Sequence, residues 1–593
     1  MGTILFGAGF TVATAWCCGA LLVRRLRIAE LDRIERALFS FLSGAACLSV
    51  LVFFFCLAQQ ARPAVFLGAG ILLIVGAVLG QWRAAAAQAG AGKRLPGIPA
   101  SWMAVLILIV TPFFFVYFMN ALAPEVSPDG SGYHLGNVAR YLAHNGFVWD
   151  YHSMYSAFPQ GMEMLFLFAF AFGGHSAAAL VHFAFLVALL FLILSYGRRF
   201  EAPRAATFAA AVVFVSPIFG LTGASAYNDV SLATGSFAVF YLLKLKHKIN
   251  NNNILCLLGL IAGFCAAIKY TGALALALGI AWLVLSRQKV AWPRFAIPAA
   301  VIALPWLIRN WLWTGDPFAP FLNYWFTDRF FSYGMEKAYL ADVGRFEELG
   351  GWWRLPLEVT LYGGRIPGFL GPVFLLAPLA LLALRRRHGR ILLAVAIAFS
   401  IPFAFNPATR FLMPGIPFLA LALGSAIEHS PGILPLLAVS QALFCWPSLT
   451  PLYAADWSWR LREIPVRAAL RIEPEAAFLR RRLPGYAMQS TIEQIVPKPE
   501  KILSFSTRPE AYIDRTVLVG YESAEAFALE KALVSARAPE DARQAAEELR
   551  RHGVRFLWVD RDDPASAELS HDSNFFGLAF VKEADGTILY RLD

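Results

Sequence analysis

The chain has 593 residues, of which 58% are hydrophobic and only 15% are charged. Its mean hydropathy of +0.57 lies far outside the range of soluble globular proteins, so the composition predicts a polytopic membrane protein. The formal net charge is +11, but the basic residues gather in short loops between apolar runs. Loops of this kind report membrane topology, and we expect no nucleic-acid partner.

About fourteen apolar runs reach or approach the roughly 20 residues that a membrane-spanning helix needs. They begin near Thr3, Arg36, Pro63, Ser101, Ser176, Pro203, Tyr227, Ile254, Gly272, Phe295, Pro367, Ile391, Phe411 and Gly432. The first run is followed rather than preceded by arginines, the reverse of a signal peptide, so we expect it to remain as a helix. The cysteines lie inside such runs or near their ends, which indicates neither a disulfide scaffold nor a thiolate metal site.

The lysines and arginines between the runs predict the topology, because cytoplasmic loops hold the excess of both. With the N-terminus outside, the inner loops collect most of them, whereas the short outer connections hold only Arg62, Arg140, Lys269 and Arg410. The polar insertions 122–175 and 314–366 then lie outside, as does everything after residue 447. Function is therefore expected on the outer face.

The chain is expected to divide into four parts. They are three N-terminal spans (1–100), a transmembrane core with both outer loops (101–447), a connector along the membrane surface (448–496) and a small soluble α/β domain (497–593). In the last part, "APEDARQAAEELRRHG" has acidic residues first, basic residues last and a glycine stop, as a helix does. The segments "VRFLWVD" and "TILYRLD" are typical of strands.

Two neighbouring runs, 254–268 and 273–286, are short for full spans but have basic clusters on both flanks. The basic flanks require an even number of crossings, which places Lys269 at the apex of a hairpin. An unpaired ammonium is costly near the membrane interior, so Lys269 is a candidate functional residue.

Polar and ionisable side chains gather at the outer ends of several runs. The stretch "SPDGSGYHLGNVARYLAHNGF" begins the first outer loop, "SAYNDVSLATG" opens the seventh run, and "PWLIRNWLWTGDPFAP" and "FNPATRFLMPG" belong to later ones. Besides Lys269, these stretches carry Asp129, Tyr133, His134, Asp229, Arg309, Asn310 and Arg410.

Each of these residues has a structural explanation when it is taken alone. Asp129 and Asp229 have the places of helix N-caps, which contribute about 1 kcal/mol. His134 suits the surface of an amphipathic helix, and Arg309 and Arg410 suit cations that reach outer headgroups. Together, however, they put acids and cations on the cation-poor face, which favours one common site at the outer membrane boundary. Carboxylates suit proton abstraction or the binding of sugar hydroxyls, whereas lysine and arginine suit phosphate.

The motifs, taken in order, resemble a known family. The first outer loop, "SPDGSGYHLGNVARYLAHNGF" followed by "YSAFPQGMEML", is similar to that of the polyprenyl-phosphate-sugar-dependent glycosyltransferases of the C superfamily. This superfamily includes protein O-mannosyltransferases and the lipid A aminoarabinose transferase. "KYTG", "RNWLWTGDPFAP" and "NPATRFLMPGIPFLAL" follow in the expected order, so the resemblance covers about residues 100–430. It implies the glycosyltransferase-C fold in a bacterial cytoplasmic (inner) membrane, with the C-terminal domain in the periplasm.

The resemblance also implies an inverting transfer of a sugar from a polyprenyl-phosphate-linked donor to a glycan, lipid or protein acceptor. The catalytic base of the family is an acid of the first outer loop, which in this chain is Asp129. Lys269 and Arg410 are the leading phosphate contacts, and Arg309 is a weaker one. Two roles are open to Asp229, orienting the acceptor or holding a cation. The candidates for substrate binding are Tyr133, His134, Asp229 and Asn310.

Three departures limit what the resemblance carries over. The family often has a second acid directly beside the first, whereas the nearest acid here is Glu125, four residues before Asp129. Three spans precede the one that leads into the first outer loop, where one is usual, and their role is unknown. The metal requirement of some relatives does not transfer, because no ligand cluster of suitable spacing is present, and a divalent cation is left open.

The main alternative is a transporter or flippase of lipid-linked glycans, for which about fourteen spans are ordinary. A transporter predicts paired repeats and broken helices near the membrane midplane, but the sequence shows no repeat and its polar groups collect at one boundary. A non-catalytic scaffold or sensor with the same fold is a second alternative. The identity of the sugar, the lipid length and the acceptor stay open.

Overall fold

The computed structural model describes residues 1–85, 95–249, 251–286, 292–344, 349–429, 432–455, 461, 463–562 and 577–592. The chain forms two compact units, each built from segments that are distant in sequence. The first unit comprises Met1–Ala123, Pro159–Pro305 and Val343–Leu470, and the second comprises Pro124–Phe158, Trp306–Asp342 and Arg471–Asp593.

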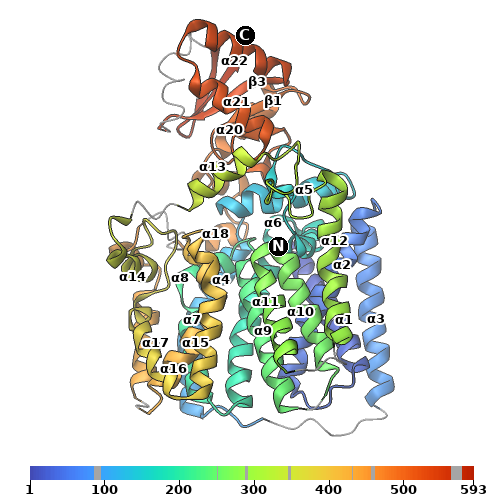
Figure 1. Ribbon diagram of the computed structural model, residues 1–593, viewed down its shortest axis with the longest axis vertical. Helices are drawn as coiled ribbons and strands as arrows, with labels where there is room; N and C mark the ends of the chain where they lie inside the picture. The colour runs from blue at the N-terminus through green and yellow to red at the C-terminus, as the bar shows by residue number, and fades with distance from the viewer. Residues whose placement is uncertain are drawn as a thin grey trace. The chain divides into compact units, whose positions relative to one another are not determined.

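The first unit is a bundle of apolar helices (Figure 1). Its N-terminal half contains α1 (Gly2–Arg25), α2 (Arg33–Leu57), α3 (Pro63–Ala85), α4 (Ala100–Leu122), α6 (Gly161–Arg199), α7 (Pro203–Phe214), α8 (Pro217–Gly223) and α9 (Asp229–Lys248). Its later part contains α10 (Ile254–Ile268), η3 (Tyr270–Gly272), α11 (Ala273–Leu285), the first part of α12 (Trp292–Thr314), α14 (Leu355–Leu357), η8 (Pro372–Arg385), α15 (Arg387–Ser400), η10 (Thr409–Leu412), α16 (Ile416–Ala426), α17 (Ile433–Phe444) and α18 (Val466–Ala469). Each of the fourteen predicted runs contains a helix from this set.

Fewer of the described helices are long and apolar enough to cross a membrane than there are predicted apolar runs. Among the described residues, seven helices are long and apolar enough to cross a membrane, or eight if the bent pair α7 and α8 forms one span. A further five apolar helices, including α10 and α16, are shorter than a span. The predicted class, a polytopic helical membrane protein with a small C-terminal sheet, is therefore confirmed, whereas the count of fourteen is not.

The longest helix, α6, begins earlier than the sequence pattern indicates. It starts at Gly161 rather than near Ser176, and it is interrupted at Gly174, whose φ of 64° and ψ of −155° suit glycine. The predicted run therefore marks only the part of α6 after this break. On both sides of the break, α6 is deeply buried, and it packs against α1, α2, α7 and α9.

The short helices α10 and α11 form the expected hairpin around Lys269. Helix α10 ends at Ile268, Lys269 is extended with φ of −159° and ψ of 145°, and the single turn η3 leads into α11. A side chain at Gly272 would place its Cβ 1.9 Å from the carbonyl oxygen of Cys265, so only glycine permits so tight a connection. The hairpin thus holds Lys269 at a fixed point between the two helices.

The second unit is built around a five-stranded sheet. Its strands are β1 (Lys501–Ser504), β2 (Val517–Val519), β3 (Val554–Asp560), β4 (Leu578–Ala584) and β5 (Thr587–Leu592), in the order β2-β1-β3-β5-β4. Strand β1 pairs in parallel with β2 and β3, and β5 is antiparallel to β3 and β4. The helices of this unit are α5 (Leu135–Ala143), α13 (Tyr333–Val343), α19 (Glu475–Arg482), α20 (Tyr486–Ile495), α21 (Ala524–Ser535) and α22 (Pro539–Arg551).

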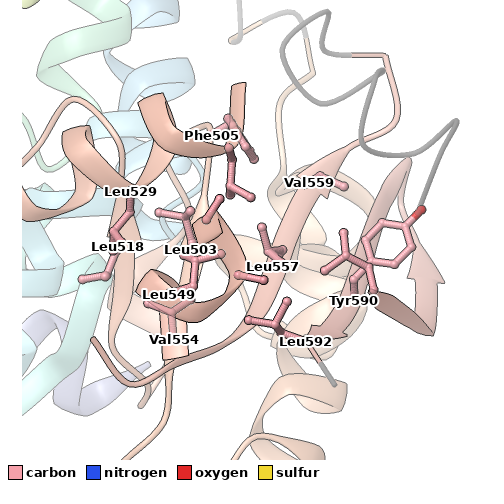
Figure 2. Close-up of a cluster of buried hydrophobic side chains, with 14 of the residues drawn as sticks. Leu503, Phe505, Leu518, Leu529, Leu549, Val554, Leu557, Val559, Tyr590 and Leu592 are labelled. Atoms are coloured by element: carbon pink, nitrogen blue, oxygen red, sulfur yellow. The ribbon is translucent and has the colours of Figure 1, made fainter. Parts of the chain in front are cut away.

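The predicted elements of the C-terminal domain are confirmed almost to the residue. The helix predicted at 538–553 is α22, and the two predicted strands are β3 and β5. Successive side chains of β3 point to opposite faces of the sheet, as in any β-strand. Leu557 and Val559 join the cluster shown in Figure 2, whereas Phe556 and Trp558 pack with residues of α20 on the other face.

The cluster of Figure 2 explains why the strands follow the sequence pattern so closely. It contains Leu503 from β1, Leu518 from β2, Leu557 from β3, Leu529 from α21 and Leu549 from α22, all at most 2% exposed. Burial of a leucine side chain stabilises the folded state by about 1.5–3 kcal/mol, so the apolar pattern alone selects the register.

Some expected features cannot be compared with the structure. Part of the connector, residues 456–460 and 462, lies outside the described residues. So do four cations expected in the inner loops, Lys93, Arg94, Arg287 and Lys289.

Candidate active site

Asp129 lies in the second unit, in the first turn of a helical segment that continues into α5. Its φ of −69° and ψ of −35° are helical, whereas an N-cap residue is typically extended. The carboxylate oxygen Oδ2 accepts a hydrogen bond from the Tyr133 hydroxyl at 3.4 Å. The turn between them, η1 (Gly130–His134), is wider than an α-helical turn. Asp129 therefore faces Tyr133 from within the helix rather than serving as its cap.

Aromatic side chains surround this turn. The rings of Tyr133 and Tyr155 are stacked at 3.9 Å with an angle of 7°, and the His134 ring lies 4.2 Å from that of Tyr133. His134 is only 2% exposed, so it is not the surface histidine that its helical pattern also allowed. The pKa of the Tyr521 hydroxyl lies well above its usual value because of burial and the nearby charges of Glu522 and Asp129.

Two acids of the C-terminal region, the partly buried Glu510 and the buried Glu522, lie among side chains of the first outer loop, within the second unit. Glu510 accepts a hydrogen bond from Arg140 at 3.2 Å, and Arg140 also pairs with Asp150. Burial and the charge of Asp150 raise the pKa of Glu510 to about 6 in spite of Arg140. Glu522 accepts a hydrogen bond from Ser153 at 2.5 Å, and burial raises its pKa well above the usual value. These contacts fix the loop that carries Asp129.

Arg309 and Asn310, at the end of α12, hold the loop that contains Tyr155. Arg309 donates to the carbonyl oxygens of Ser156 and Phe158 at 2.9 and 3.1 Å, and Asn310 donates to that of Ala157 at 2.6 Å. Both side chains are almost fully buried, at 3% and 0% exposure. The Arg309 guanidinium also lies over three aromatic rings, those of Phe147, Trp306 and Trp313. The contacts given by the structure therefore make both residues supports of the loop 156–158.

The other candidates lie together in the first unit. Asp229 begins α9 and is 3% exposed, and the Lys269 ammonium donates to its Oδ1 at 2.9 Å. The same ammonium lies 4.4 Å from the centre of the Phe411 ring. Arg410, in η10, lies over the rings of Phe411 and Tyr227 at 5.6 and 5.9 Å. Phe411 thus contacts both cations, in accord with the attraction between cations and aromatic faces.

Asp229, Lys269 and Arg410 line one narrow pocket of the first unit. Its remaining walls are mostly apolar, with Leu274, Phe399 and Pro402 among them. Charges in such surroundings interact more strongly than charges in water. With Asp229 ionised, the three groups carry a net charge of +1, so the pocket favours an anion.

The structure thus divides the predicted residues into two groups. Asp229, Lys269 and Arg410 are brought together in the first unit. Asp129, Tyr133, His134, Arg309 and Asn310 belong to the second unit, where Arg309 and Asn310 support the loop after Tyr155. The described residues contain no group of three or more histidine, cysteine, aspartate or glutamate side chains that could hold a metal ion.

Tyr155 and Tyr521 were not found by sequence reasoning. Tyr155 is the first residue of the motif "YSAFPQGMEML". The position of this motif shortly after the polar stretch was the only feature of the sequence that could have indicated a place for Tyr155 near Asp129. Tyr521 lies in the C-terminal domain, nearly 400 residues from Asp129, and no local pattern connects the two.

The chain belongs to the family described as "Domain of unknown function (DUF8201)", whose model matches residues 1–342. The match covers more than half of the chain and includes α1, α2 and α3 together with the segment that carries Asp129. No curated protein sequence matches the chain.

Solved structures of glycosyltransferases have a similar fold. ArnT from Cupriavidus metallidurans in the apo state has a TM-score of 0.52 and 14% identity, over 84% of this chain and 99% of that chain. The same protein bound to undecaprenyl phosphate has a TM-score of 0.49 and 14% identity, over 84% and 98% of the two chains. The arabinofuranosyltransferase AftD from Mycobacteria has a TM-score of 0.47 and 14% identity, over 84% of this chain and 40% of that chain. The likeness to apo ArnT confirms the expected glycosyltransferase-C fold.

Proposed function

We propose that the protein is a membrane glycosyltransferase that moves a sugar from a polyprenyl-phosphate-linked donor to an acceptor on the outer face of the membrane. The observation that carries the proposal is the pocket that gathers Asp229, Lys269 and Arg410 from three distant segments. Two cations beside apolar walls suit the phosphate of a lipid-linked sugar. The fold shared with ArnT supports the same class of reaction.

In the proposed reaction, Asp129 is the general base. It takes the proton from the acceptor hydroxyl as that oxygen attacks the anomeric carbon, and the bond from this carbon to the phosphate oxygen breaks. Attack from the side opposite the phosphate inverts the anomeric configuration. The helical conformation of Asp129 and its hydrogen bond with Tyr133 support a role other than that of a cap.

Lys269 and Arg410 stabilise the negative charge that develops on the leaving phosphate. Tyr133 and His134 position the substrate, and Asp229 holds the Lys269 ammonium until the bond between the sugar and the phosphate breaks. We assign Arg309 and Asn310 to positioning, because both donate hydrogen bonds to backbone carbonyl oxygens of residues 156–158. Asn310 also donates to the carbonyl oxygen of Ala319, and Arg309 donates to the side-chain oxygen of Asn310. The acceptor can be a glycan, a lipid or a protein. The need for a divalent cation as cofactor is also open.

The first test compares the envelope glycans of cells that lack the protein with those of cells that contain wild-type protein or the Asp129→Asn variant. Loss of a general base lowers the rate by about 10²–10⁴-fold, so we expect the variant to leave the glycan unmodified and the lipid-linked sugar to accumulate. Glu125→Gln is the matched control, since Glu125 accepts a backbone hydrogen bond from Ser127 at 2.7 Å and a glutamine oxygen can do the same. Full transfer by Asp129→Asn would show that the base is another residue.

A second test addresses the phosphate contacts. Arg410→Gln is expected to raise the KM for the lipid-linked donor and to weaken inhibition by polyprenyl phosphate. If the envelope glycans of cells with and without the protein are identical while labelled lipid-linked sugar crosses the membrane, the protein is a flippase and the proposed transfer is wrong.

A further inference from the structure

The three N-terminal helices pack against one another inside the first unit. Helices α1 and α2 touch closely, because a Cβ at Gly19 would lie 1.7 Å from the Ser40 carbonyl oxygen, and one at Gly44 equally close to that of Ala15. Helices α2 and α3 meet near their connection, where the rings of Phe55 and Phe66 are 6.2 Å apart. Figure 1 shows α1, α2 and α3 as neighbours at the blue end of the chain.

Away from that connection, α2 and α3 leave a groove with α1 as its floor. This N-terminal groove has a volume of about 280 Å³ and is lined mainly by apolar surface. Ala20 and Leu21 of α1 and Ala77 of α3 form its apolar part, and Trp16, 38% exposed, lies at its side. Such a space between membrane-spanning helices suits an acyl chain.

Three arginines line the same groove, Arg24 from α1 and Arg33 and Arg36 from α2. Arg24 lies against α3, because a Cβ at Gly80 would be only 2.8 Å from its guanidinium. The described residues that line the groove include no acid. The nearest acids in the sequence are engaged elsewhere.

These acids are Glu30, Asp32 and Glu35. The Glu30 carboxylate accepts a hydrogen bond from Asn251 at 3.2 Å, and Asp32 and Glu35 contact the end of α6. Asp32 pairs with Arg198, and Glu35 accepts hydrogen bonds from Arg199 and from the Tyr241 hydroxyl. None of the three acids is among the described residues that line the groove, so its three arginines give it a positive charge. The positive-inside pattern of the sequence places this end of the helices at the cytoplasmic face.

We propose that the N-terminal groove is a binding site for an anionic glycerophospholipid. Arginine forms paired hydrogen bonds with phosphate oxygens, and basic pockets between membrane helices on the cytoplasmic side suit lipid headgroups. The phosphate lies among Arg24, Arg33 and Arg36, and an acyl chain lies along Ala77 between α2 and α3. The site gives the three N-terminal helices a role that does not depend on the proposed transfer reaction.

The test uses the full-length protein in detergent and native mass spectrometry with cardiolipin, phosphatidylglycerol or phosphatidylcholine. We expect saturable binding of cardiolipin, with phosphatidylcholine bound at least about tenfold more weakly. The double variant Arg24→Gln with Arg33→Gln should lose roughly 30-fold in affinity for cardiolipin, since two basic contacts are removed. The double variant Arg25→Gln with Arg27→Gln is the matched control, because it removes the same charge from exposed positions that do not line the groove.

A third variant, Ala37→Trp, keeps every charge and fills the groove from an exposed position. It should weaken cardiolipin binding as well, because the acyl chain loses its place. Equal binding of phosphatidylcholine and cardiolipin would overturn the proposal, and so would an equal loss in the Arg25 and Arg27 control. Competition by sn-glycerol 3-phosphate as strong as that by cardiolipin would show a phosphate site without a lipid.

Discussion

Glu525 is the centre of a charged cluster in the second unit, and its replacement by glutamine tests the electrostatics of the C-terminal domain. It lies in the first turn of α21 and accepts hydrogen bonds from Lys501 at 3.0 Å and from the ring of His552 at 3.0 Å. Its other carboxylate oxygen lies 3.1 Å from Nδ1 of His152. Burial alone would raise the pKa of this carboxyl. Hydrogen bonds and charges from His152 and Lys501 outweigh burial and lower the pKa to about 2.

The size of the effect follows from the lowered pKa. A carboxyl with a pKa of 4.5 in the unfolded chain and about 2 in the folded one adds roughly 3 kcal/mol of stability near neutral pH. This contribution is present above pH 4.5, because both states are then ionised. It is lost as the pH falls from 4.5 to about 2, because the unfolded state takes up its proton first.

The assay is hydrogen exchange of the full-length protein, followed in peptides from α21. Glu525→Gln should speed exchange at pH 7 by an amount that corresponds to roughly 3 kcal/mol, and the wild-type protein should approach the variant as the pH falls below 4.5. Glu547→Gln is the matched control, since its carboxylate is 64% exposed and lies 3.9 Å from Arg551. Equal protection of α21 in wild type and Glu525→Gln at pH 7 would refute the reasoning.

Three further predictions concern other parts of the structure. Arg309→Lys should lower the melting temperature in thermal unfolding, since lysine cannot reproduce the planar contacts with the carbonyls of 156–158, and a change of about 1–3 kcal/mol is expected. Gly44→Leu should reduce the folded yield in gel filtration because α1 leaves no room for a side chain, whereas Gly9→Leu, where the space is open, should not. In the wild-type protein, stability should fall as the pH rises from 4.5 to 6, because the raised pKa of Glu510 makes the folded state bind this proton more tightly than the unfolded state does. Glu510→Gln should abolish this fall, as measured by thermal unfolding across that pH range.

Local patterns of the sequence predicted the elements that depend on local forces. Helix α22 was predicted from the order of its charges and from its apolar positions, because an amphipathic helix buries one apolar stripe. Strand β3 was predicted from its continuous apolar run, because a central strand buries both of its faces. The apolar runs identified the helices of the first unit for the same reason. The break at Gly174 was missed, since an apolar run continues on both sides and only the backbone shows the interruption.

The candidate site was harder to predict, because its contacts join distant segments. The outer ends of the runs suggested that Asp229 and Lys269 belong to one common site. Their ion pair was not predicted, because it joins residues 40 positions apart and depends on the hairpin of α10 and α11. The contacts of Arg309 with the carbonyl oxygens of Ser156 and Phe158 were not predicted, because they have no signature in the sequence. Tyr521 was missed for the same reason.

The charges of the pocket bear on the direction of the proposed reaction. Before transfer, the donor phosphate is a diester with a single negative charge, which matches the net charge of +1 from Asp229, Lys269 and Arg410. As the bond to the sugar breaks, a second negative charge develops on the phosphate, and Lys269 can follow it by leaving Asp229, whose carboxylate lies 2.9 Å away. An ammonium that is shared in this way interacts more strongly with the transition state than with the donor, and only such a difference accelerates the chemical step. Under the proposed function, the ion pair of Lys269 with Asp229 is therefore part of catalysis, and Asp229→Asn should lower kcat more than it changes the KM for the donor.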